Sequence, residues 1–353
     1  DLPLPLATTR SLEGLRKFVQ AKDAWNNGDR NQAMNLWQEA TVLDSDFALA
    51  HASLGGAYYW ANDRPRGEEH FARALKLLDR LTDRERFQVR SQVEGWRGNR
   101  EAAIDILKAR LAAYPDDREV WGAIGYNYMR LNRDRDALDA YAKQLAIDSG
   151  SASDLINIAT AHKGLKQYQE SLRYYESAFA LQPSWRTLDN LNHEYGTTLV
   201  MAGKSKEARD AFTAMLSGTP ENQAMGHRSL GMLDELEGRF EDAIGHFRQA
   251  AVLSQARQHP LSEARNRVFL AMALRDKGRA DSAREELGTA YALFRKNYFE
   301  PTFVWWLGKA LVANGQVARA RELLDSLTRR ASNSEDRRSQ LSLQGEIALA
   351  EGR

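Results

Sequence analysis

A turn residue recurs along the chain at a nearly constant interval, and this period constrains the fold more than any other feature. Neighbouring turns lie 34 to 40 residues apart over the 353 residues. A fixed period of this length is typical of repeat architectures, in which each repeat buries its apolar face against its neighbours. The turn residues are Gly28, Asn62, Gly98, Asn132, Lys166, Gly203, Gly238, Gly278, Gly315 and Gly352.

Residue size follows the same period. The positions seven residues before each turn and five residues after it always hold Gly, Ala or Ser. Small residues there allow two antiparallel helices to approach closely, and no strand-type alternation of polar and apolar residues competes with this pattern. We therefore expect nine helix–turn–helix units, in which a large apolar residue nine positions after the turn fills the groove to the next unit. These large residues are Trp37, Phe71, Leu107, Tyr141, Tyr175, Phe212, Phe247, Leu287 and Leu324.

The fourth unit resembles a tetratricopeptide repeat (TPR). The resemblance is carried by Trp121, Ile124, Gly125, Tyr128, Ala137 and Tyr141. It implies an all-α fold, a right-handed α-solenoid of about nine TPR helix-turn-helix repeats plus a tenth first helix. Residues 12–353 would form this superhelix, and residues 1–11 an N-terminal extended segment. The tenth unit lacks a second helix, so either Ser339–Glu351 serves as a capping helix or the natural protein continues beyond Arg353. We expect continuation, because Gly345 and Gly352 keep the repeat register.

Charge and cysteine content disfavour several classes of function. The 49 Lys and Arg residues almost balance the 48 Asp and Glu residues, so neither nucleic acid nor an anionic membrane surface is the expected partner. The absence of cysteine excludes disulfides, thiol catalysis and thiolate zinc sites. The longest uncharged apolar stretch is too short and too polar to span a bilayer, so we expect no direct membrane insertion. The compartment stays open between the bacterial cytoplasm and the periplasmic side of the inner membrane.

Catalytic motifs are lacking. The seven histidines show no metal-ligand spacing, and no nucleophile motif occurs. His227 and His246 fall on the two helices of one repeat and could approach, although ordinary surface histidines are the favoured interpretation. We therefore predict a protein that is not an enzyme and needs neither cofactor nor metal.

The first helices of the repeats should form a concave face. Residues thirteen, ten, six and three positions before each turn are expected to project into it. Aromatic, Met and Arg residues are common on adaptable protein-binding surfaces. We therefore expect a protein or peptide partner, with acidic groups favoured by the basic residues, and end-to-end self-association is a second option. The candidate binding residues are Phe18, Lys22, Trp25, Tyr59, Tyr126, Met129, Lys163, His193, Met225, Arg228, Met232, Arg265, Met272, Arg275, Trp305 and Lys309.

The type of TPR protein can be narrowed further. TPR co-chaperones that grip a terminal carboxylate carry a Lys ten residues before the turn, which never occurs here, so that clamp is disfavoured. The stretches Pro3–Gly28, Asp46–Asn62 and Thr82–Phe87 resemble the TPR region of bacterial signalling proteins that contain a Ser/Thr kinase, winged-helix or TolB-like domain. This resemblance implies a scaffold or sensor module. The alternative function is the small-metabolite-sensing domain of a bacterial regulator.

Overall fold

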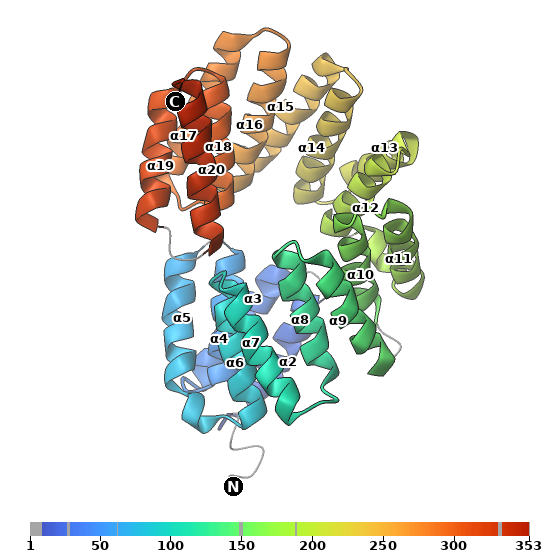
Figure 1. Ribbon diagram of the computed structural model, residues 1–353, viewed down its shortest axis with the longest axis vertical. Helices are drawn as coiled ribbons and strands as arrows, with labels where there is room; N and C mark the ends of the chain where they lie inside the picture. The colour runs from blue at the N-terminus through green and yellow to red at the C-terminus, as the bar shows by residue number, and fades with distance from the viewer. Residues whose placement is uncertain are drawn as a thin grey trace. The chain divides into compact units, whose positions relative to one another are not determined.

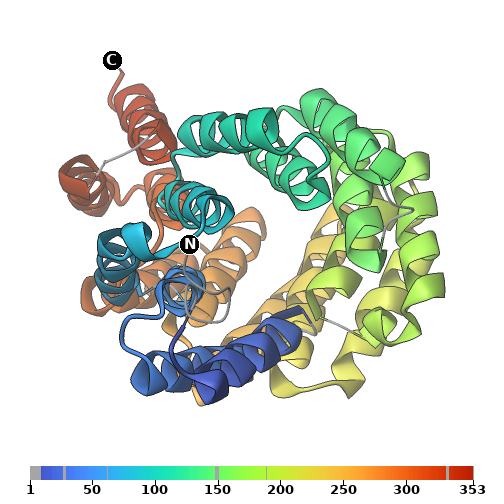
Figure 2. The ribbon, with the colours of Figure 1, turned by 90° about the horizontal axis from the view of Figure 1, so that it is seen from below.

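The chain is built from antiparallel helix pairs. The computed structural model describes residues 9–26, 29–61, 63–147, 151–187, 189–330 and 334–352. These ranges contain nineteen α-helices, three short 3₁₀ helices and no strand, so the all-α prediction is confirmed for them. The chain divides into two compact units, Asp1–Gly150 (unit 1) and Ser151–Arg353 (unit 2). In each unit, successive helix pairs follow one another along a curve (Figures 1 and 2).

Unit 1 contains four helix pairs. In each pair the first helix packs against the second, and the second packs against the first helix of the next pair. A 3₁₀ turn, Leu78–Arg80, lies between the second and third pairs. The helices are α2 (Leu12–Asn26), α3 (Arg30–Leu43), α4 (Ala48–Trp60), α5 (Arg64–Lys76), α6 (Asp83–Trp96), α7 (Arg100–Ala113), α8 (Arg118–Arg130) and α9 (Asp134–Ile147).

Unit 2 continues the same pattern and ends on a single helix that packs against the preceding pair. Its two 3₁₀ helices are Pro183–Thr187 and Met215–Ser217. The α-helices are α10 (Ala152–Gly164), α11 (Tyr168–Leu181), α12 (Asp189–Met201), α13 (Ser205–Ala214), α14 (Pro220–Leu236), α15 (Phe240–Ala256), α16 (Pro260–Asp276), α17 (Ala280–Lys296), α18 (Pro301–Ala313), α19 (Val317–Arg330) and α20 (Ser334–Ala350).

Left-handed backbone ends the first helix of most repeats. Gly98, Gly203, Gly238, Gly278, Gly315 and Gly352 all have positive φ. Glycine is suited to these positions because it lacks the Cβ that makes left-handed backbone costly. Asn132 and Lys166 adopt the same conformation, with φ of 58° and 60°. Gly28 and Asn62 lie outside the described residues.

Close helix contact explains the small residues around each turn. A Cβ added to Gly55 would lie 2.5 Å from the Phe71 ring, and one added to Gly125 would lie 2.5 Å from the Tyr141 ring. The large residue therefore packs over the glycine of its own repeat. This contact was not predicted, because the large residue was expected to fill the groove to the next repeat.

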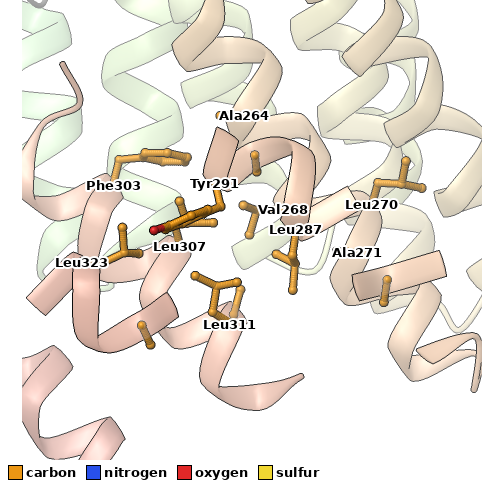
Figure 3. Close-up of a cluster of buried hydrophobic side chains, with 14 of the residues drawn as sticks. Ala264, Val268, Leu270, Ala271, Leu287, Tyr291, Phe303, Leu307, Leu311 and Leu323 are labelled. Carbon is orange, nitrogen blue, oxygen red and sulfur yellow. The ribbon is translucent and has the colours of Figure 1, made fainter. Parts of the chain in front are cut away.

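Unit 2 has an aliphatic core around α16 to α19. Val268, Leu287 and Leu307 are fully buried there and point toward one another (Figure 3). Burying one such side chain stabilises the folded state by about 1.5–3 kcal/mol, which is too little to order a repeat of some 34 residues alone. The repeats are therefore stable only as neighbours, and this shared core holds the first helices, which carry the candidate binding residues, in register.

Candidate functional site

Some of the predicted binding residues belong to the hydrophobic core. Phe18 is only 7% exposed, and its ring centroid lies 5.0 Å from that of Phe47. Met225, Met232 and Met272 are partly buried and pack against the cores of unit 2, whereas Met129 is half-buried and Lys22 is exposed. The structure thus gives Phe18 and the three unit 2 methionines a packing role.

Unit 1 contains a cavity of about 580 Å³ with aromatic walls. Its four large aromatic rings come from four successive first helices: Trp25 on α2, Trp60 on α4, Trp96 on α6 and Tyr126 on α8. Trp60 is 46% exposed and Tyr126 is 41% exposed. A cavity of this volume with exposed rings can take an apolar side chain or a small molecule.

The sequence analysis identified two of these four rings. Trp25 and Tyr126 were predicted, but Tyr59 was chosen where its neighbour Trp60 lines the cavity. The Tyr59 ring lies 5.2 Å from that of Phe71, and its hydroxyl donates a hydrogen bond to Glu68. Burial and that carboxylate raise the pKa of Tyr59. Trp60 and Trp96 both stand two residues before their turns, an offset that the prediction did not sample.

Cations and amides complete the wall of the cavity. The Arg30 guanidinium lies 4.0 Å from the centroid of the Trp25 ring, and burial lowers its pKa. Arg110 forms a buried ion pair with Asp117, with 2.7 Å between Nη2 and Oδ2. Arg100 donates to the Asn127 side-chain oxygen at 3.4 Å. This wall can attract a negatively charged group while the rings hold an apolar one.

Unit 2 presents a row of polar side chains on its first helices. The Lys163 ammonium on α10 lies 2.6 Å from Glu194 and 2.9 Å from the Thr197 hydroxyl, both on α12. His193 on α12 lies with Nδ1 2.8 Å from the Ser229 hydroxyl on α14. Three of the predicted residues, Lys163, His193 and Arg228, are thus placed on consecutive first helices.

Arg228 is the most buried cation of this row, at 8% exposure. Burial, together with the cation of Arg265 on α16, lowers its pKa to about 10. Burial also lowers the pKa of His193 to about 4, with contributions from the cations of Arg228, Lys163 and Arg265. His193 is therefore neutral at physiological pH.

The remaining predicted residues lie towards the C-terminal end of unit 2. Arg275 forms an ion pair with Asp276 at 2.7 Å. Lys309 lies 3.2 Å from Glu346 and 6.0 Å from the ring centroid of Trp305. Arg265 makes a long contact of 3.4 Å with Glu300.

The two histidines that could approach do so. The Nδ1 atoms of His227 and His246 are 2.9 Å apart, beside an open cavity of about 590 Å³. Burial lowers the pKa of both rings. The second pair, His51 and His70, has the same 2.9 Å separation and was not predicted. Within the described ranges, no three His, Cys, Asp or Glu side chains are grouped as a metal site.

The helices are too short or too polar to cross a bilayer, as far as the described residues show.

Comparison with known proteins identifies the repeat. Residues 155–184 and residues 270–335 match family models described as tetratricopeptide repeat. The chain is 23% identical over 235 residues to protein O-mannosyl-transferase TMTC3 of Homo sapiens, covering 59% of this chain and 25% of that protein. It is 27% identical over 135 residues to the peroxisomal targeting signal receptor of Candida albicans, covering 36% of this chain and 23% of that protein.

The chain therefore spans about a quarter of the length of these two relatives. A solved tetratricopeptide repeat protein from Parabacteroides merdae is similar with a TM-score of 0.49 and 15% identity, covering 74% of this chain and 98% of that one. Together, the two repeat matches and the small-against-large packing of the helix pairs show that the chain is a tetratricopeptide-repeat protein.

Proposed function

We propose that this chain is a non-enzymatic scaffold that binds an extended or helical protein segment in its concave groove. The observation that carries the proposal is the unit 1 cavity, because four successive first helices each contribute an aromatic ring to it. Trp and Tyr dominate the energetics of protein interfaces when they line a preformed pocket. The name of one relative, a peroxisomal targeting signal receptor, supports segment binding by this repeat.

The proposed segment carries both apolar and acidic side chains. The rings would accept the apolar group, and Arg30 beside Trp25 would attract the acidic one. The resemblance of the N-terminal stretches to bacterial signalling proteins supports a place as the interaction or sensor part of such a protein. Self-association through the end repeats is a further option within this proposal.

The test is a peptide-display selection against the whole chain. Selected peptides are then measured by fluorescence anisotropy against the double variant Trp60→Ser/Tyr126→Ser. Both rings are partly exposed, so the variant should fold, and binding should weaken by about tenfold or more, as expected for interface hot spots. The matched control is Val42→Ser/Leu181→Ser, which changes exposed apolar residues outside the cavity. Equal binding to wild type and cavity variant would refute the cavity as the binding site.

A second candidate function is metabolite sensing, favoured by the volume and lining of the same cavity. Small-molecule sites are typically concave and apolar with a few polar groups. Thermal unfolding would be followed across a metabolite panel. A metabolite that raises the melting temperature of wild type, but not of the Trp60→Ser/Tyr126→Ser variant, would place this function first.

A further inference from the structure

Arg228 has an unusual environment for a buried cation. It is 8% exposed, yet no carboxylate or carbonyl group in the described part of the chain lies within ion-pairing or hydrogen-bonding distance of its guanidinium. Two other arginines differ: the buried Arg110 pairs with Asp117, and the half-buried Arg267 pairs with both Glu263 and Glu286. A charge this deeply buried keeps little of its hydration. No Arg228 nitrogen is among the fully buried atoms that lack a hydrogen-bond partner, so the guanidinium stays open to a ligand.

The cation of Arg265 adds positive charge beside Arg228. Arg265 has only the long contact with the partly exposed Glu300, at 3.4 Å. Lys163 is neutralised by Glu194 at 2.6 Å. Lys163 and Arg265 thus each have a glutamate partner, and Arg228 is left as the cation of the row without one. One bound monoanion would balance it.

His193 supplies a hydrogen-bonding group beside this charge. The Ser229 hydroxyl donates to the carbonyl of Met225 at 2.9 Å, so its single hydrogen is already used. The 2.8 Å contact with His193 then requires Nδ1 of the histidine to donate. The neutral ring therefore keeps an unprotonated Nε2. When an anion binds nearby, Nε2 can take up a proton and donate it to the anion.

We propose that Arg228, assisted by Arg265 and His193, binds the carboxylate of an acidic side chain carried by the partner segment. The planar fork of a guanidinium matches a carboxylate in two parallel hydrogen bonds. The inference rests on the proposed scaffold function and places the carboxylate site on α12, α14 and α16 of unit 2. It gives the burial of Arg228 a functional reason, since the missing counter-ion arrives with the partner.

The first experiment uses an acetylated tetraglutamate amide as the probe and the whole chain labelled with ¹³C-histidine. Binding of the peptide at the site should raise the pKa of His193 from about 4 by one unit or more, because a nearby anion favours the imidazolium. Sodium chloride at equal ionic strength is the reference. No movement of the His193 resonance with peptide would overturn the proposal. Movement with inorganic phosphate but not with peptide would overturn it in favour of a phosphate site.

The second experiment separates this site from the cavity of unit 1. Arg228→Gln should weaken tetraglutamate binding by about tenfold, as loss of a buried charged contact predicts. Arg284→Gln is the matched control, since Arg284 is outside the predicted binding residues and pairs with Asp281 on its own helix at 2.7 Å, and it should change binding less than twofold. Arg228→Gln should unfold at the same or a higher urea concentration, because it removes an unpaired buried cation. If that variant fails to fold, the partly exposed Arg265 replaces it as Arg265→Gln with the same expectation.

The two proposals fail in different ways. If Arg228→Gln binds tetraglutamate as well as wild type while Trp60→Ser/Tyr126→Ser loses the display-selected peptides, only the carboxylate site is refuted. If the reverse holds, the carboxylate site stands and the cavity is refuted as a segment-binding site.

Discussion

Repeat two (α4 and α5) and repeat seven (α14 and α15) bring two histidines together from the same two positions. His51 and His70 have their Nδ1 atoms 2.9 Å apart, and so do His227 and His246. In each pair one nitrogen must donate and the other accept, so at least one ring is neutral. The two repeats therefore produce the same contact, because the repeat backbone places the Cα atoms of both histidines at equivalent positions.

The surroundings of the two pairs differ. In repeat two Nε2 of His51 lies 3.0 Å from the carbonyl oxygen of Ser45, and a further difference lies at an equivalent position of the two repeats. Four residues before the turn, repeat two has Tyr58 and repeat seven has Asp234. The Tyr58 ring stacks on His70 with centroids 5.4 Å apart, whereas a buried oxygen of Asp234 lies 3.6 Å from Nε2 of His246. The repeat geometry thus sets the contact, while the side chains around each pair set the electrostatic environment of its rings.

The largest expected difference between these repeats concerns their glycines. A Cβ at Gly55 would meet the Phe71 ring at 2.5 Å and the backbone oxygen of Gly67 at 3.1 Å, whereas the three atoms nearest to one at Gly231 all belong to the Phe247 ring, the first at 2.7 Å. Overpacking costs about 1–3 kcal/mol, partly offset by about 1 kcal/mol of helix propensity. Gly55→Ala should therefore lower the free energy of unfolding by about 2 kcal/mol and Gly231→Ala by about 1 kcal/mol or less, since backbone moves less readily than a ring.

Urea unfolding of both variants measures this difference. Gly245→Ala serves as the control, because a Cβ there meets nothing within 4 Å. If Gly231→Ala proves the more damaging substitution, the close backbone approach in repeat two is not what distinguishes the two helix pairs.

Acid should destabilise both repeats. Burial lowers the pKa of His51, His70, His227 and His246 from the ordinary value of 6.5. As the pH falls towards and below 6.5, the unfolded chain binds more protons at these histidines than the folded chain does. The free energy of unfolding therefore falls as the pH falls. Each such proton contributes a slope of at most about 1.4 kcal/mol per pH unit. Above pH 6.5 the slope fades as the unfolded histidines lose their protons, and it is close to zero by about pH 8.

Urea midpoints at pH 7.5, 6.5 and 5.5 measure the effect, above the range where most carboxylates titrate. The variant His51→Gln/His70→Gln should lose part of the slope. A midpoint that rises on acidification would show that the protonated rings are favoured in the folded chain.

The sequence predicted the fold better than it predicted the site, for a physical reason. Small and large residues at fixed offsets report directly on helix packing, as the Gly125 and Tyr141 contact shows. The approach of His227 to His246 followed from the same register, and the identical offsets of His51 and His70 could have revealed the second pair. The offsets did not separate Tyr59 from Trp60. Both are aromatic, and although adjacent helix residues point about 100° apart, the spacing alone does not say which of the two directions faces the cavity. Nor could they show that Arg228 lacks a partner, which depends on side chains from other repeats.

The smallest expected effect concerns Asp234, which lies beside the His227–His246 pair and has Tyr58 as its counterpart in repeat two. Asp234→Asn removes the carboxylate beside His246, so the pKa of His246 should fall further below 6.5, because Asp234 favours its protonated form. Tyr58→Phe is the matched change in repeat two and should leave the pKa of His70 unchanged, since it keeps the ring that stacks on His70 and removes no carboxylate. Histidine resonances followed by NMR over pH 4 to 8 report both values. An equal response in both repeats would mean that the His–His contact itself, which the two repeats share, controls the titration. A response in His246 alone would assign the difference to Asp234.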